Sequence, residues 1–271
     1  MTPGASEIYD GAMTPPARDD VLADLAGGAV PSWMADQIRA DAAASRFARW
    51  GRSTVVDTHI DEPVLARELF DELHGLAGLV GDEASAAGIA WPIGNAGLLH
   101  VYGYLLSTGD TPHGPKRDRW LGGGVARAFG LPGDAFAPWF VTPSATGSTP
   151  LERITAVAEP FAVDPADGDF TVLWIDETGS ALGAGAASHV GAQLARTVVV
   201  RDEDSGAAAL VYAVGTIDEP LLVTLFPLED FDAEWLEHAT VGPPRLRYNA
   251  VDERNVASAA LAGREVTLRG F

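Results

Sequence analysis

The stretch TVVVRDEDSGAAALVYAV, residues 197–214, decides the fold of the second half of the chain. It contains two apolar runs of strand length, residues 197–201 and 208–214, both rich in β-branched or aromatic side chains. The polar cluster DEDSG between them, residues 202–206, is typical of a hairpin loop. This stretch therefore predicts a pair of antiparallel strands.

Two similar runs lie on either side of this pair, FTVLWI at residues 170–175 and LLVTLF at residues 221–226. Together the four runs predict an antiparallel meander. Around them we expect a helix at residues 181–195, a short helix at residues 232–238, and edge strands at residues 245–248 and 265–268.

A helix is predicted to begin just before this sheet region. Thr149 and Glu152 have the spacing of a capping box, and Pro150 stands at the first helical position. The helical pattern changes after Pro160.

The first half of the chain is dominated by helical patterns. Helices are expected at residues 32–50, in a segment that begins at Asp61, and at residues 96–106 with Asn95 as the cap. A fourth is expected at residues 116–129, either with a break at the glycines 122–124 or beginning only after them. In the second of these, Asp61 would be the N-cap and Pro63 would lie in the first turn, before leucines at positions 65, 69, 73 and 76.

These patterns predict an α+β protein whose mostly helical N-terminal half precedes an antiparallel β-meander with flanking helices. We expect a flexible arm at residues 1–30, a mostly helical region at 31–148, and an α+β region at 149–271. The boundary is placed in the turn-rich residues 130–148, and the two regions can also form one continuous domain.

The composition excludes several classes of function. The chain has 271 residues, 47% of them hydrophobic, and 18 basic against 38 acidic side chains give a net charge of −20. A field of that sign repels nucleic acids and anionic membrane surfaces, so neither is expected as a partner. The absence of cysteine excludes disulfides, thiolate nucleophiles and cysteine-based metal sites. With no signal-like or membrane-spanning segment in the sequence, we expect a soluble, cytoplasmic protein.

Lysine occurs once, at Lys116, and the other 17 basic residues are arginine. A GC-rich genome would favour arginine codons and explains most of this bias. Any mechanism that needs a lysine amine, such as Schiff-base formation, therefore has one possible site.

Residues 110–120, DTPHGPKRDRW, gather positive charge in an acidic chain. His113, Lys116, Arg117 and Arg119 are the candidate ligand-binding residues, because guanidinium and ammonium groups at the start of a helix suit a small anion. The alternative is that these cations form surface salt bridges with nearby acidic residues.

His100 and Tyr104 are the candidate catalytic residues. They are four residues apart in a predicted buried helix, so their side chains lie on one face, and a histidine in a cleft can exchange protons near neutral pH. The alternative is a satisfied core histidine beside a packed tyrosine.

Three further patterns in the sequence are weaker. VVDTHID, residues 55–61, resembles the metal-binding first strand of amidohydrolase-type barrels, which implies His59 and Asp61 as ligands, but the segments that follow do not form eight βα units. GAGAAS, residues 183–188, imitates part of a dinucleotide fingerprint without its third glycine. Arg245 and Arg247 alternate in a manner that suits an anion site or a charged strand edge.

Besides metal-dependent hydrolysis through His59 and Asp61, which the weak barrel resemblance would imply, the sequence supports two main hypotheses. The first is an enzyme that acts on a small anionic metabolite by acid/base chemistry, with the cofactor and the reaction left open. The second is a non-enzymatic acidic protein that binds or inhibits a basic protein partner through its negative field.

Overall fold

The computed structural model describes residues 14–57, 60, 62–86, 89–141, 148–166, 170–178, 193–229 and 248. It confirms the α+β class, with helices concentrated in the N-terminal half and a four-stranded antiparallel sheet in the C-terminal half. Among these residues, no helix has the length and hydropathy that a membrane crossing requires.

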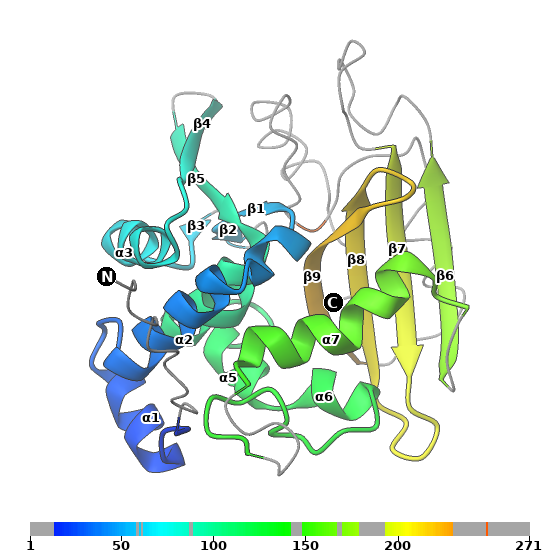
Figure 1. Cartoon of the computed structure of the whole chain (residues 1–271), viewed down its shortest axis with the longest axis horizontal. Coiled ribbons are helices and arrows are strands. Elements are labelled where there is room, and N and C mark those ends of the chain that lie inside the picture. The colour runs from blue at the N-terminus through cyan, green and yellow to red at the C-terminus, as the bar shows by residue number, and fades with distance from the viewer. Residues whose placement is uncertain are drawn as a thin grey trace, which may run out of the picture.

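The predicted meander is present (Figure 1). Its strands are β6 (Thr171–Thr178), β7 (Leu194–Arg201), β8 (Ala208–Gly215) and β9 (Pro220–Leu228), which pair in this order. Val198 lies opposite Val211 in the central pair, and a bulge interrupts the β8–β9 register after Tyr212. The hairpin at residues 202–206 is therefore confirmed.

The sheet buries side chains on both faces. Helix α7 (Pro150–Val163) and helix α6 (Gly124–Ala128) cover the face that carries Val198 and Val211 (Figure 1). On the other face Leu210, Tyr212 and Val223 form a second apolar cluster, where the ring of Tyr248 meets that of Tyr212 edge-on at 4.9 Å. Burial on both faces explains why β7, β8 and β9 have continuous apolar runs rather than alternating ones, whereas Leu173 and Trp174 of β6 are exposed.

Helix α7 begins as its sequence predicts. The Thr149 hydroxyl accepts a hydrogen bond from the Glu152 backbone N–H at 3.1 Å, with Pro150 at the first helical position. The helix continues past Pro160 to Val163 instead of ending at the proline.

The other helical elements lie earlier in the chain. They are α1 (Arg18–Ala26), α2 (Ser32–Ala43), the 3₁₀ turn η1 (Arg46–Arg49), α3 (Arg67–Ala77), the π-helical turn η2 (Leu98–Gly103), α4 (Tyr104–Leu106) and α5 (Lys116–Leu121). Asn95 accepts a hydrogen bond from the Leu98 backbone N–H at 3.1 Å, as expected of a cap, and residues 96–106 are helical. The predicted break at residues 122–124 separates α5 from α6.

The N-terminal half also contains strands that the sequence does not predict. β1 (Arg52–Thr54), β5 (Ile89–Asn95) and β4 (Asp82–Ala86) form one small sheet, and β2 (Val56–Asp57) pairs with β3 (Glu62–Pro63). Pro63 therefore lies in a strand rather than in a first helical turn, and α3 begins four residues later with Ala66 at its N-cap.

Some other predictions are wrong or fall outside the described residues. Residues 18–26 form a helix whose Val21 and Leu25 are buried, although the sequence suggests a loose arm there. Leu194 and Ala195 belong to β7 and not to a helix, while the remainder of the expected helix at residues 181–195 lies outside the described residues, except Gln193. The expected elements at residues 232–238 and 265–268 lie outside them too, as do residues 245–247.

One hydrophobic core joins the two halves, because a single cluster contains Val21, Leu73 and Leu98 together with Val198 and Val211. A backbone hydrogen bond also joins the two halves, because the Gly51 N–H donates to the Leu222 carbonyl of β9 at 2.8 Å. Strand β1, which follows at once, therefore starts beside the large sheet.

A buried carboxylate reinforces the junction. Asp41, fully buried on α2, accepts hydrogen bonds from the Tyr102 hydroxyl at 2.6 Å, from the Thr149 hydroxyl at 2.5 Å and from Arg46 at 3.0 Å. Burial raises the pKa of this carboxyl, and the three donors partly oppose that effect. The residues tied to Asp41 come from η1, η2 and the start of α7.

Candidate functional site

Side chains from five elements form a polar cluster close to β9. They are Ser53 of β1, Asp57 of β2, His100 of η2, Tyr104 of α4, and Lys116 and Arg119 of α5. We call this set the polar cluster. Four of its six members, His100, Tyr104, Lys116 and Arg119, are residues that the sequence singles out.

An ion pair between Lys116 and Asp57 lies at the centre of the cluster. The Asp57 side chain is only 4% exposed and that of Lys116 is 17% exposed, so the pair is largely withdrawn from water with one side open. Lys116 begins α5 and Arg119 follows three residues later, a spacing that places both on one face of a helix. Consistent with this, Arg119 interacts electrostatically with Asp57 as well as with Glu229.

His100 and Tyr104 meet as the helical spacing predicts, but through their ring faces. Their rings stack at 4.8 Å between centroids with an interplanar angle of 29°. The Lys116 ammonium lies 5.5 Å from the centre of the Tyr104 ring, within the range of a cation–π interaction. The Tyr104 ring thus lies close to both the imidazole and the ammonium group.

The imidazole of His100 lies in the most deeply buried part of the cluster. His100 is 2% exposed, and its Nε2 lies 3.3 Å from the hydroxyl oxygen of Ser53, which has no exposed surface. Burial and the neighbouring Lys116 charge lower the pKa of His100 to about 3. The imidazole is therefore neutral at physiological pH and does not have the near-neutral pKa that the sequence argument assumes.

The phenol of Tyr104 stays protonated over the whole physiological range. Burial raises the pKa of Tyr104, and the negative charge of Asp57 raises it further. A protonated phenol beside a carboxylate can donate a proton or a hydrogen bond to a bound molecule.

The remaining predicted ligand-binding residues are placed differently. Arg117 donates from its Nε to the Leu105 carbonyl oxygen at 2.7 Å. His113 is half-buried in the turn between Thr111 and Gly114, where its backbone N–H donates to the Thr111 hydroxyl at 3.3 Å. The Arg117 hydrogen bond ties the start of α5 to α4.

Sequence reasoning misses Ser53 and Asp57 as members of the cluster. The signal available for Asp57 is its position directly after Val55 and Val56, since an acidic residue that continues an apolar run is a candidate for burial with a partner. Nothing in the local sequence marks Ser53.

The weaker sequence patterns gain no support from the described residues. No group of three or more metal-binding side chains occurs in the part of the chain that the structure describes. His59, Asp61, the GAGAAS segment, Arg245 and Arg247 all lie outside that part.

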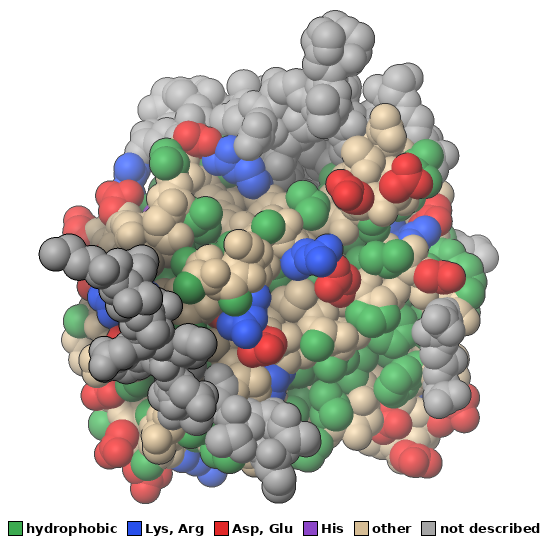
Figure 2. All heavy atoms as spheres, in the orientation of Figure 1, with side chains coloured by type: hydrophobic (Ala, Val, Ile, Leu, Met, Phe, Trp, Pro, Cys, Tyr) green, Lys and Arg blue, Asp and Glu red, His purple; other side chains and the backbone are tan. Residues whose placement is uncertain are grey.

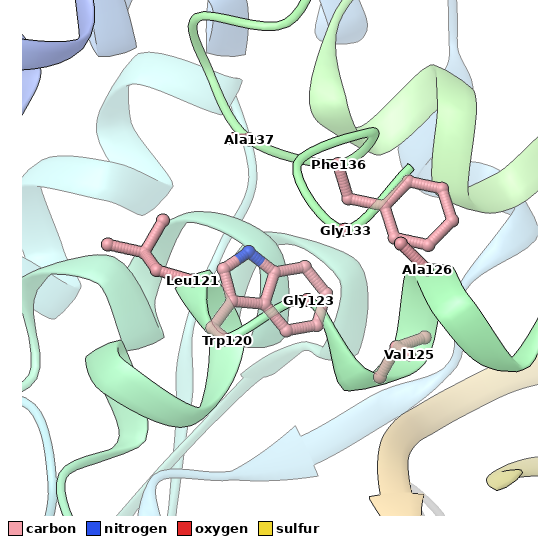
Figure 3. Close-up of a pocket in the computed structure, with 8 residues that line it drawn as sticks. All are labelled: Trp120, Leu121, Gly123, Val125, Ala126, Gly133, Phe136 and Ala137. Atoms are coloured by element: carbon pink, nitrogen blue, oxygen red, sulfur yellow. The ribbon is translucent and has the colours of Figure 1, made fainter. Parts of the chain in front are cut away.

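A small apolar pocket lies next to α5 (Figure 3). Its eight lining residues, which include Trp120, Val125 and Phe136, are all apolar or glycine, and it contains about 260 Å³ of empty space, part of which is open solvent. None of the predicted site residues lines it. In one wall the backbone of Gly123 closely approaches that of Gly133. Gly123 has φ +71°, and a Cβ at this position would lie 2.0 Å from the Gly133 carbonyl oxygen, so there is no room for a side chain.

Comparisons of this chain with protein-family models, with curated proteins and with solved structures found no match.

Proposed function

We propose that this protein is an enzyme that acts on a small anionic metabolite by acid/base chemistry at the polar cluster. The observation that supports it is the convergence of an ammonium, a guanidinium, a carboxylate, a phenol and an imidazole from four elements. Clusters of desolvated titratable groups with shifted pKa values are typical of active sites. Withdrawing charged groups from water costs desolvation free energy, and apolar side chains would fill the same space without that cost.

The roles in this proposal follow the exposure of each group. Lys116 and Arg119 are within reach of solvent and bind the anion. Tyr104 and Asp57 exchange protons with it, because one is protonated and the other lies in contact with a proton donor. His100 lies behind Tyr104 as a neutral positioning residue.

A thermal-shift screen tests the anion site. Phosphate, acetate, malonate and pyruvate would each be added to the wild-type chain, to Arg119→Gln and to Arg39→Gln, the last being a matched control at an exposed arginine paired with Asp36. Saturation at 100 times the dissociation constant stabilises by about 2.7 kcal/mol, which raises the Tm of a chain of this size by roughly 5–10 °C. We expect one class of anion to stabilise the wild type and Arg39→Gln but not Arg119→Gln. Equal shifts in all three chains, or none, would exclude the site.

Turnover is tested once a stabilising anion is known. Tyr104→Phe keeps the ring that contacts His100 and Lys116 but removes the phenolic proton. We expect this variant to bind the anion and to lose the turnover of the wild type. Full turnover by Tyr104→Phe would remove the phenol from the mechanism.

The acidic-partner hypothesis has less support. On the face drawn in Figure 2, the acidic side chains lie apart over several elements, so the described residues on this face offer no single patch to a basic partner. The net charge of −20 still predicts that nucleic acid is not a partner, and a cytoplasmic location remains part of the proposal.

A further inference from the structure

The single lysine of the chain stands in an unusual place. Arginine occupies the other 17 basic positions, yet the residue that pairs with the buried Asp57 is Lys116. Arginine would form an ion pair with Asp57 at least as well as lysine does, because it binds carboxylates through two parallel hydrogen bonds and is less strongly hydrated. Lysine offers one property that arginine lacks: it can lose its proton and react as an amine.

The surroundings of Lys116 supply what such a reaction needs. Asp57 touches the ammonium group and can accept its proton. Arg119, on the same face of α5, offers a cation that can bind a carboxylate on the reacting molecule. Tyr104 lies under the ammonium group with its proton in place. The lysine side chain is 17% exposed, so part of it lies at the protein surface.

We infer that the amine of Lys116 forms an imine with the ketone or aldehyde carbon of a 2-oxo acid, whose carboxylate is bound by Arg119. This inference rests on the proposed function and names its substrate class. A 2-oxo acid is a small anion whose carboxylate and carbonyl group are adjacent, which matches a guanidinium and an amine placed three residues apart on one helix face.

The step balances without any redox partner. Asp57 takes one proton from the ammonium group, and the nitrogen lone pair forms a bond to the carbonyl carbon as the C=O π electrons move to oxygen. A second proton passes from nitrogen to this oxygen, which gives a carbinolamine. Asp57 then returns the first proton to the hydroxyl, which leaves as water while nitrogen forms the C=N bond. The sum is ammonium plus carbonyl compound giving protonated imine plus water.

Trapping with borohydride tests the inference on the wild-type protein. The chain is incubated with glyoxylate, pyruvate or 2-oxoglutarate and then with sodium borohydride, which reduces an imine to a stable secondary amine. Besides Lys116, the α-amine of the chain is the other primary amine, so peptide mapping separates the two sites. We expect an adduct at Lys116, with pyruvate adding the mass of pyruvic acid less one oxygen atom.

Variants separate this inference from the proposed function. Lys116→Arg keeps a cation opposite Asp57 and should give no adduct beyond the α-amine background. Arg119→Gln should lower trapping of pyruvate about tenfold and leave that of acetone, which has no carboxylate, unchanged. Arg39→Gln should trap both as the wild type does. If 2-oxo acids stabilise the wild type through Arg119 but leave no adduct at Lys116, the imine inference fails while the proposed anion site stands. If no anion acts through Arg119, the proposed function fails.

Discussion

The burial of His100 makes a quantitative prediction about stability and pH. In the folded chain its pKa is about 3, against 6.5 for an ordinary histidine. Between these values the unfolded chain binds a proton that the folded chain does not, so acid favours unfolding. The stabilisation is complete above pH 6.5 and is lost as pH falls toward 3. Each pKa unit corresponds to about 1.36 kcal/mol, and titration of this one group removes about 2 kcal/mol between pH 8 and pH 5.

His100→Gln is the variant of choice, because its amide can still reach the Ser53 hydroxyl but does not titrate. The free energy of unfolding is measured by urea denaturation at pH 5, 6, 7 and 8, followed through tryptophan fluorescence. We expect the wild type to lose about 2 kcal/mol more than the variant over this range. Only the pH dependence is compared, so any constant cost of the substitution cancels. His74, buried with a lowered pKa, contributes equally to both chains.

A wild type and a variant that lose the same stability between pH 8 and pH 5 would refute the reasoning. That result would mean that His100 takes up its proton in the folded state about as readily as in the unfolded one. The imidazole would then be available for proton transfer, and its role in the proposed mechanism would change.

Three further substitutions have defined outcomes in denaturation experiments. Thr149→Ala removes both the cap of α7 and a donor to a buried carboxylate, so the free energy of unfolding should fall by about 2–4 kcal/mol, whereas Thr149→Ser should stay close to wild type. Lys116→Met removes the ammonium group that pairs with the buried Asp57 carboxylate and should cost about 2–4 kcal/mol, much of which Asp57→Asn in the same chain should restore; a double variant as unstable as the sum of the singles would argue against coupling. Gly123→Ala places a Cβ 2.0 Å from a facing carbonyl oxygen and should cost more than about 2 kcal/mol, while Gly28→Ala, with the same φ of +71° and open space around it, should cost about 1 kcal/mol.

The parts of the fold that the sequence predicts are those with local signals. The cap at Thr149, the hairpin at residues 202–206 and the apolar runs of the meander each depend on residues close together in the chain. Strands β2 and β4 have no such signal: β2 has two residues, and β4 has the sequence DEASA, which shows no apolar alternation. Pairing with distant partners makes them strands, so tertiary structure overrides local preference there.

In the candidate site, too, the contacts with a local sequence signal are predictable and the long-range contacts are not. The His100–Tyr104 contact and the shared face of Lys116 and Arg119 follow from helical spacing and are visible in the sequence. Ser53 and His100 are 47 residues apart in the sequence, and no local pattern predicts their contact. The shifted pKa of His100 was likewise beyond prediction, because it depends on how completely the fold excludes water from the imidazole.

The hydrogen bond between Thr149 and Asp41 spans 108 residues and joins the two halves of the chain. Because the ends of so large a loop must meet before this contact forms, we expect its closure to slow the folding of the chain. Residues 31–148 and 149–271, produced as separate fragments, would each leave that junction uncovered. We expect them to remain poorly ordered alone and to become ordered when mixed, which makes the chain a natural subject for split-protein complementation.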